Sequence, residues 1–345
     1  NGASLAAVDF GKSPMEYLRN IPLNMKEIKP HVLLSVPALA KNFRRSIETG
    51  IRQRGWLIRK LYGLGLKWGY YYHGQGNFRG KGGRMLLWPV VKLMDILVFS
   101  KIRKIFGGNL QFFVGGGALL DTELQRYYCT LGIPMLQGYG LSEASPVISS
   151  NCPQRYRFGS SGQVVKPLEL KICDETGTEV KKGEKGEIVI RGKNVMKGYW
   201  KNEKSTAGTI RDGWLYTGDM AMQDEDGFYF LVDRKKDVIV SGGENIYPVQ
   251  IEDFMRRHDK IKDVAVIGLP DRRLGEKTAA IIEVKDGMSC TEEEIEESCM
   301  ELPRYKRPKE IIFSEIPRNA TGKIEKPKLR KMYGADRLVA QENQA

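Results

Sequence analysis

The sequence predicts an α/β protein: part of a large doubly wound α/β domain, a small β-barrel-like subdomain and a small α+β C-terminal domain. Three observations support this prediction. Strand-like and helix-like segments alternate through residues 1–155, short alternating strands follow through residues 156–235, and a new helix–strand pattern fills residues 236–345. A chain of 345 residues is long enough for about two domains.

The first segment sets the α/β alternation. Residues 1–8 predict a short apolar strand, 13–30 a helix, 31–37 a buried strand, and 38 onward a second helix. Because the alternation opens without a first strand or a cap, we expect these residues to be the latter part of a larger domain.

Residues 56–108 predict a Gly- and Arg-rich loop followed by an apolar helix from Met85 to Phe99. That helix contains Pro89, Lys92 and Asp95, and is too short and too polar to span a bilayer. One interpretation is a helix on the domain flank beside a solvated basic loop. The other is an interfacial element in which basic residues beside Trp, Tyr and Leu contact an anionic membrane.

Glycine-rich turns follow two predicted strands. An apolar strand runs into Gly115–Gly117, Asp121 begins a helix, and the short strand 134–137 leads to Gly138–Glu143. Glycines at the carboxyl ends of strands let a flat ligand approach the backbone closely, so this edge is a candidate binding site.

Hairpins and a second helix–strand pattern make up the rest. Turns at 174–177, 183–186 and 224–227 separate the strands of residues 156–235. In residues 236–345, Pro248 lies in the first turn of a helix, and Thr291 with Glu294 predicts a capping box.

Composition narrows the function classes. A net charge of +13 attracts acidic partners such as nucleotides, coenzyme A phosphates or anionic lipid. Five scattered cysteines, without a C-x-x-C pair, favour reduced thiols in the cytoplasm over disulfides or structural zinc. None of the three histidines lies beside a Ser or Cys nucleophile, and no signal peptide or RNA-binding signature is visible. We therefore expect no nucleic-acid partner, and a cytoplasmic protein that the interfacial interpretation would place at the inner membrane surface.

One stretch organises the rest of the chain. Residues 214–252 contain Tyr216-Thr217-Gly218-Asp219, then Asp233-Arg234-Lys235-Lys236-Asp237, then Gly243-Glu244-Asn245-Ile246-Tyr247-Pro248. A carboxylate on a turn before a hairpin and an Arg at the far end of that hairpin can face one polar ligand. The carboxylate suits vicinal hydroxyls as an acceptor, and the Arg supplies forked donors.

In order and spacing this stretch resembles the ribose-binding and hinge motifs of adenylate-forming (AMP-binding) enzymes. Within that superfamily the segment His31–Phe43 is similar to long-chain fatty acid–CoA ligases, and nearly all of the chain resembles the C-terminal portion of such an enzyme. The Ser/Thr/Gly-rich phosphate loop of the superfamily does not occur in the sequence, so we expect residues 1–345 alone to make little acyl-adenylate.

The resemblance implies a role for each site residue. Gly116, Gly117 and Ala118 would line adenine, and Tyr139, between Gly138 and Gly140, would stack on it. Ser142 would contact the α-phosphate, and Glu143 would coordinate Mg²⁺. Asp219 and Arg234 would bind the ribose, and Lys323 would supply the catalytic charge. Lys236 would be the hinge of a mobile C-terminal domain that brings Gly242, Gly243 and Glu244 to the thiol tunnel.

The implied activity is the ATP-dependent conversion of a fatty acid to an acyl-adenylate and then to an acyl-CoA, with ATP, Mg²⁺ and coenzyme A. Ligation to an acyl-carrier protein, or of another carboxylic acid to coenzyme A, remains open. So does a non-catalytic nucleotide- or acyl-binding protein with this fold. Acyl chain length and oligomeric state are not readable from the sequence.

Overall fold

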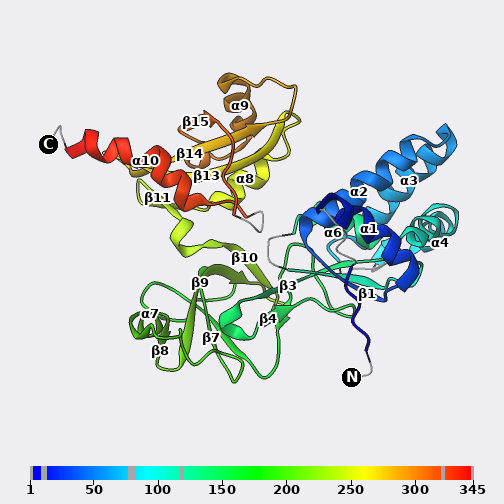
Figure 1. The fold of residues 1–345 in the computed structure, drawn as a ribbon, viewed down its shortest axis with the longest axis horizontal. Helices are drawn as coiled ribbons and strands as arrows, with labels where there is room; N and C mark the ends of the chain where they lie inside the picture. The colour runs from blue at the N-terminus through cyan, green and yellow to red at the C-terminus, as the bar shows by residue number, and fades with distance from the viewer. Residues whose placement is uncertain (1–2, 9–13, 77–81, 117–119, 320–322, 343–345) are drawn as a thin grey trace. The chain divides into compact units, whose positions relative to one another are not determined.

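The computed structural model describes residues 3–8, 14–76, 82–116, 120–319 and 323–342. The chain divides into two compact units. One contains residues 1–171, 190–215 and 223–231, and the other contains residues 172–189, 216–222 and 232–345. The described strands form three five-stranded sheets, and helices lie between many of them in the chain, in agreement with the predicted α/β class (Figure 1).

The first sheet has the order β1-β2-β3-β4-β5. Its strands are β1 (Val32–Ser35), β2 (Phe112–Gly115), β3 (Met135–Gly140), β4 (Val147–Ser150) and β5 (Gln163–Val164). The first three are parallel, and β4 and β5 pair antiparallel. Parallel neighbours need a crossover connection, which the helices between β1 and β2, and α6 (Thr122–Thr130) between β2 and β3, provide.

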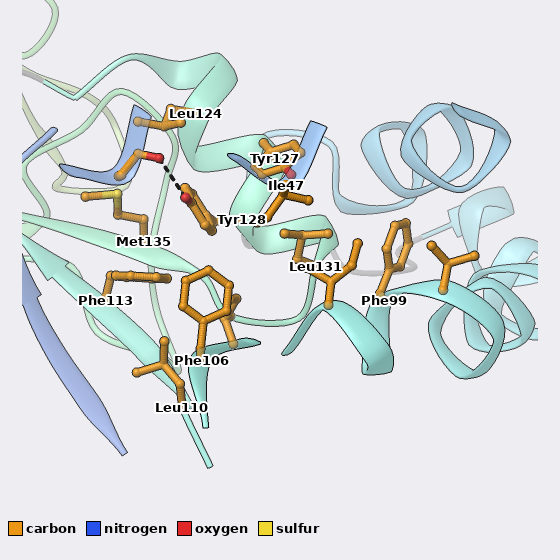
Figure 2. Close-up of a cluster of buried hydrophobic side chains, with 14 of the residues drawn as sticks. Ile47, Phe99, Phe106, Leu110, Phe113, Leu124, Tyr127, Tyr128, Leu131 and Met135 are labelled. Atoms are coloured by element: carbon orange, nitrogen blue, oxygen red, sulfur yellow. Dashed lines mark hydrogen bonds between the residues drawn. The ribbon is translucent and has the colours of Figure 1, made fainter. Parts of the chain in front are cut away.

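The helices of this unit share one apolar core with the sheet. They are α1 (Pro14–Ile28), α2 (Pro37–Arg52), α3 (Trp56–His73), α4 (Trp88–Met94), α5 (Ser100–Arg103) and α6. Phe99, Phe106, Phe113 and Tyr127 are almost fully buried in this core (Figure 2). The Tyr128 hydroxyl donates to the Ala40 carbonyl oxygen at 2.7 Å, so this buried polar group is satisfied.

Two expectations for the N-terminal segment are wrong. Residues 3–8 form no strand. Strand β1 is not buried but lies at the end of the sheet order, and Leu34 is 70% exposed. An edge strand has a neighbour on one side only, which hydropathy alone does not reveal.

The Gly-rich loop predicted from residue 56 is also wrong in its first part, because Trp56–His73 is helical. A Cβ on Gly65 would lie 2.8 Å from Phe99 Cζ, and one on Gly69 would lie 2.2 Å from Thr130 Cγ2. These glycines therefore let α3 pack closely on its neighbours. The apolar helix predicted for 85–99 is divided among η1 (Gly82–Leu87), α4 and the π-helical turn η2 (Asp95–Phe99). The short helices α5 and η3 (Lys104–Phe106) follow it.

The second sheet has the order β10-β9-β7-β6, with β8 paired to β9. Its strands are β6 (Glu169–Cys173), β7 (Lys185–Arg191), β8 (Ile210–Arg211), β9 (Trp214–Gln223) and β10 (Tyr229–Arg234), with α7 (Glu203–Thr209) before β8. The predicted turn at 224–227 joins β9 to β10, where Asp224 N donates to the Phe228 carbonyl oxygen at 3.0 Å.

The third sheet has the order β12-β11-β14-β13, with β15 parallel to β14. Its strands are β11 (Ile239–Ser241), β12 (Glu244–Ile246), β13 (Ile261–Asp271), β14 (Gly275–Val284) and β15 (Glu310–Phe313), and its helices are α8 (Pro248–Met255), α9 (Glu292–Ser298) and α10 (Lys326–Glu342). Alternate residues of β13 face different clusters: Val264 and Val266 pack with α8 and α9, whereas Ile267 and Leu269 pack with Leu329 of α10. The predicted capping box at Thr291 and Glu294 is present.

Asn151 forms the centre of a buried polar network beside β3. Its Nδ2 donates to the carbonyl oxygens of Gln137 and Ser160, at 3.0 and 2.8 Å. Its Oδ1 accepts from Arg157 N at 3.0 Å and from Ser160 Oγ at 3.2 Å. The network thereby fixes the strand that leads to Gly138–Gly140.

We predict that Asn151→Ala lowers the free energy of unfolding by about 3 kcal/mol, because the Ser160 carbonyl oxygen and the Arg157 amide lose their side-chain partner. Urea denaturation measures this change. The exposed Asn109 provides the control, and Asn109→Ala should stay within about 0.5 kcal/mol of the wild type. Equal effects of the two substitutions would contradict a structural role for the network.

Candidate active site

The carboxyl ends of β2 and β3 hold the glycines predicted to meet adenine. Gly116 follows β2 directly, and no atom lies within 4 Å of a Cβ placed there. Gly117 and Ala118 lie outside the described residues. The buried Gln137 connects the two ends, since its Oε1 accepts from Leu120 N at 3.0 Å and its Nε2 donates to Ser161 Oγ at 3.2 Å. Sequence reasoning missed this Gln, although an amide in an otherwise apolar strand is a usable signal.

The pairing of β3 with β4 gives a structural reason for glycine in this segment. Gly138 and Gly140 lie within β3 opposite β4, and a Cβ on Gly140 would come within 2.1 Å of the Pro146 carbonyl oxygen. Tyr139 between them is 9% exposed. Close strand packing therefore requires glycine at position 140, and stacking of Tyr139 on adenine remains a prediction.

Glu143 is held by a segment to which the sequence assigned no function. Ser142 and Glu143 lie in the 3₁₀ turn η4 (Ser142–Ala144), with Ser142 exposed and Glu143 half-buried. The Tyr199 hydroxyl donates to Glu143 Oε1 at 3.0 Å, and Met196 N donates to the Glu143 carbonyl oxygen at 2.8 Å. Burial raises the pKa of Tyr199, and the hydrogen bond to Glu143 raises it further. Tyr199 thus orients a carboxylate whose second oxygen can meet a cation.

Glu143 suits a Mg²⁺ ion that takes one ligand from the protein, rather than a metal ion coordinated by several protein side chains. Within the described ranges, no group of three or more His, Cys, Asp or Glu side chains could hold a metal ion. Mg²⁺ needs only one or two protein carboxylates, because water and phosphate oxygens complete its coordination. Glu143 can therefore contribute one ligand where a nucleotide contributes others.

The structure brings Asp219 and Arg234 together, although the turn expected around Asp219 is part of strand β9. Asp219 Oδ1 lies 3.7 Å from Arg234 Nε, and the side chains are 15% and 56% exposed respectively. Gly218 before them has φ +71°, a left-handed conformation that favours glycine. A pair this exposed on one side contributes about 0–1 kcal/mol to folding, so a ligand can replace its weak contact at little cost.

Glu187 binds the backbone next to Asp219 and the side chain next to Arg234. Sequence reasoning did not identify Glu187. Its Oε1 accepts from Gly218 N at 2.9 Å, and its Oε2 accepts from Lys235 Nζ at 2.8 Å. The side chain is 8% exposed and lies on β7, whose residues 186–190 are all buried. A lone carboxylate in a buried apolar strand is the signal that could have found it, because such a charge needs partners.

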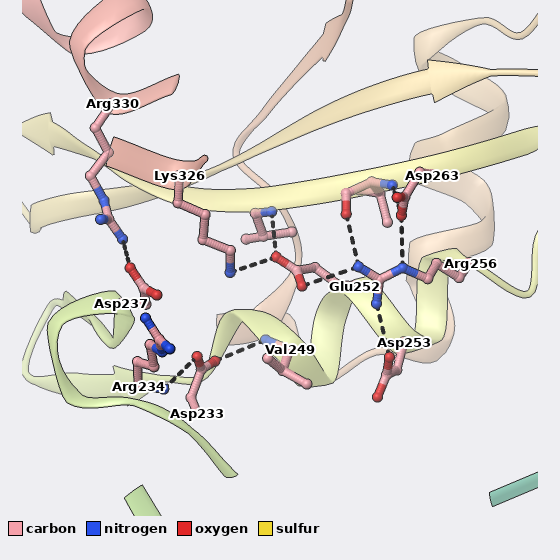
Figure 3. Close-up of polar contacts among 12 residues, drawn as sticks. Asp233, Arg234, Asp237, Val249, Glu252, Asp253, Arg256, Asp263, Lys326 and Arg330 are labelled. Atoms are coloured by element: carbon pink, nitrogen blue, oxygen red, sulfur yellow. Dashed lines mark hydrogen bonds and ion pairs between the residues drawn. The ribbon is translucent and has the colours of Figure 1, made fainter. Parts of the chain in front are cut away.

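Hydrogen bonds and an ion pair tie the DRKKD segment to α8 and α10 (Figure 3). Asp233 accepts from Arg234 N at 2.8 Å and from Val249 N at 3.0 Å, and burial raises its pKa. Asp237 pairs with Arg330 of α10 at 2.7 Å. Lys236, the predicted hinge, is exposed in the 3₁₀ turn between them.

The remaining predicted residues lie near β11 and α10. Gly242 and Gly243, with φ +59° and +85°, connect β11 to β12, where Glu244 is exposed. Lys323 is exposed shortly before α10. Its N donates to Asn319 Oδ1, and Asn319 N donates to its carbonyl oxygen, both at 2.9 Å. These residues share a compact unit with Asp219 and Arg234, whereas Gly116, Gly138–Gly140, Ser142 and Glu143 belong to the other unit.

We predict that Glu187→Ala destabilises the protein by about 2–3 kcal/mol, because it leaves the Gly218 amide without its acceptor and Lys235 without its partner. Denaturant unfolding measures the change. The exposed Glu175 of the same unit is the matched control, with an expected change below about 0.5 kcal/mol. If Glu187→Ala were as mild as Glu175→Ala, the supporting role of Glu187 would be wrong.

Comparison with protein families and curated sequences places the chain among AMP-binding enzymes. A family model described as AMP-binding enzyme matches residues 10–200, and the model of the AMP-binding enzyme C-terminal domain matches residues 250–323. The long-chain-fatty-acid–CoA ligase of Bacillus subtilis (strain 168) is 40% identical over 226 residues, or 64% of this chain and 40% of that protein. The feruloyl-CoA synthase of Amycolatopsis sp is 38% identical over 230 residues, or 66% and 47%. The chain spans about half the length of the curated relatives it matches.

Solved structures give the same fold. ATP-bound MatB from Rhodopseudomonas palustris has a TM-score of 0.69 and 25% identity, with 92% of this chain and 53% of that chain covered. The o-succinylbenzoate coenzyme A synthetase of Bacillus subtilis, in complex with ATP and magnesium ion, has a TM-score of 0.59 and 31% identity, with 64% and 46% covered. The predicted fold class and the resemblance to adenylate-forming enzymes are therefore confirmed, and the chain belongs to the AMP-binding enzyme family.

Proposed function

We propose that this protein, as part of a complete enzyme, joins a carboxylic acid to coenzyme A through an acyl-adenylate. The observation that carries the proposal is the Asp219–Arg234 pair. The two side chains lie 3.7 Å apart on the neighbouring strands β9 and β10, and Glu187 accepts from the amide before Asp219. A rigid carboxylate acceptor beside a guanidinium donor matches a ribose with its vicinal hydroxyls. Relatives named as CoA ligases for several acids support the reaction class.

The proposed residues divide the chemistry between them. The acid attacks the α-phosphorus of ATP, pyrophosphate leaves, and a thiol then attacks the acyl carbon and releases AMP. Asp219 and Arg234 fix the ribose so that the α-phosphorus is presented in line. Mg²⁺, when bound, neutralises charge on the phosphate oxygens, and Glu143, oriented by Tyr199, would provide its protein ligand. Lys323 adds a positive charge during adenylation.

A change of conformation would separate the two half-reactions. We propose that the C-terminal domain turns about Lys236, which withdraws Lys323 and brings Gly242, Gly243 and Glu244 to the thiol. Hinges are commonly a few residues at the ends of elements, and Lys236 lies in the short turn between β10 and β11.

Long-chain fatty acid is our proposed substrate, based on the segment His31–Phe43 and the apolar region after it. The relatives' names include feruloyl, succinylbenzoate, indoleacetate and long-chain fatty acids, so the acid tested must vary. A reaction that consumes ATP and coenzyme A suits the cytoplasm, as do five cysteines that form no disulfide in the described residues. Transfer to an acyl-carrier protein and simple nucleotide binding are the competing functions.

The direct test is acid-dependent pyrophosphate release by the longest natural form of the protein, with ATP, Mg²⁺ and palmitate, ferulate or indoleacetate. We expect Lys323→Ala to lower the adenylation rate about 100-fold or more, as the loss of a charge that meets developing phosphate charge does. Asp219→Ala should raise the KM for ATP about tenfold, because it removes roughly one charged hydrogen bond to the ribose.

The control is Lys328→Ala, an exposed lysine of α10, which should stay within about twofold of the wild type. Acyl-CoA should form only when coenzyme A is added. Pyrophosphate release that no acid stimulates would reject the ligase proposal and favour nucleotide binding alone. A better rate with a phosphopantetheinyl carrier protein than with coenzyme A would favour the carrier-protein ligase.

A further inference from the structure

The helices before β2 carry many exposed apolar side chains. About half of the large hydrophobic side chains that are exposed in the described residues lie between residues 56 and 105. We call the exposed side chains of α3, η1, α4 and η2 the α3–α4 surface. Met85 and Leu86 on it are 71% and 84% exposed, and Trp56 and Trp88 are more than half exposed. Such a concentration marks an interaction site.

The charge of the same segment is one-sided. Residues 54–105 contain eleven Lys and Arg residues and one acidic residue, Asp95. Asp95 is already paired with Arg103, whose Nη2 lies 3.1 Å from Asp95 Oδ2. Large apolar and aromatic side chains interleaved with cations fit the headgroup region of an anionic bilayer, where lysine and arginine stems snorkel. No helix in the described ranges is long and apolar enough to cross a membrane, so the contact would be peripheral.

A cationic cavity of about 440 Å³ adjoins this surface. Lys67, Trp68, Tyr71, Arg84 and Arg126 are among its lining residues, none of which is acidic. The Arg84 guanidinium carbon lies over the Tyr71 ring, 5.3 Å from its centroid, at a cation–π distance. The Arg126 Nε is buried and has no hydrogen-bond partner in the described part of the chain.

The cavity and the surface share residues. Lys67, Trp68 and Tyr71 are exposed on α3 and also line the cavity, and Arg84 directly precedes Met85 and Leu86. Guanidinium and ammonium groups beside an unsatisfied buried N–H suit the oxygens of a phosphate, which accept several charge-assisted hydrogen bonds. The cations therefore line a cavity that shares residues with the exposed apolar surface.

We propose that the α3–α4 surface binds the surface of an anionic phospholipid membrane, and that the cavity takes the phosphate of one lipid headgroup. This inference goes beyond the ligase proposal and does not depend on it, because binding alone is measured.

The test is cosedimentation of the chain with vesicles of phosphatidylcholine alone or mixed with phosphatidylglycerol. We expect binding to the mixed vesicles only, weakened by salt. Leu86→Glu should lower the partition coefficient at least tenfold, whereas Met288→Glu, an equally charged change at an exposed site of the other unit, should not. The Lys67→Gln/Arg84→Gln double variant should have a partition coefficient about 30-fold lower, because it loses two cations near the membrane surface. The exposed pair Lys181→Gln/Lys182→Gln is its control.

Several results would overturn the proposal. These are equal binding to both kinds of vesicle, no binding, or equal loss in each variant and its control. Binding of inorganic phosphate in calorimetry without vesicle binding would make the cavity a site for free phosphate instead. Loss of vesicle binding in the longest natural form of the protein would mean that protein covers the surface. Circular dichroism of each variant separates lost binding from lost folding.

Discussion

One buried carboxylate, Glu187, determines where the candidate nucleotide-binding groups lie. It accepts from the amide before Asp219 and from the lysine after Arg234, so it joins two segments that the intervening hairpin separates. Taking a charge out of water is unfavourable unless hydrogen bonds satisfy it, and Glu187 obtains two. The Asp219–Arg234 contact therefore does not have to stabilise this region, because Glu187 already holds the backbone amide before Asp219. A weak, exposed Asp219–Arg234 contact on a rigid base is well suited to exchange its partner for a ligand.

The other compact unit uses buried amides in the same way. Gln137 and Asn151 tie β3 and the end of the glycine-rich loop to the segment around Ser160 and Ser161. Tyr199 then orients Glu143 from a segment to which the sequence analysis assigned no role. In both units, buried polar side chains hold the backbone segments that carry the residues proposed to contact a ligand.

Local rules predicted much of this architecture, and long-range packing explains the failures. The capping box at Thr291, the start of α8 at Pro248 and the turn at 224–227 depend on a few neighbouring residues, so sequence reasoning found them. The helix 56–73 was missed because its glycines serve contacts with Phe99 and Thr130, far along the chain. Asp219 and Arg234 were predicted as a pair from motif order, whereas Glu187 and Tyr199 act through partners 31 to 56 residues away, which no local pattern shows.

Recognition of ribose hydroxyls by Asp219 is the central claim, and comparison of two nucleotides tests it most directly. Calorimetry with the longest natural form would measure Kd for AMP and for 2′,3′-dideoxy-AMP, in the wild type and in Asp219→Ala. The account predicts that the wild type binds AMP at least about tenfold more tightly than the dideoxy analogue, and that Asp219→Ala binds both alike, since a charged hydrogen bond contributes roughly 1.5–3 kcal/mol. Equal affinity of the wild type for the two nucleotides would contradict it.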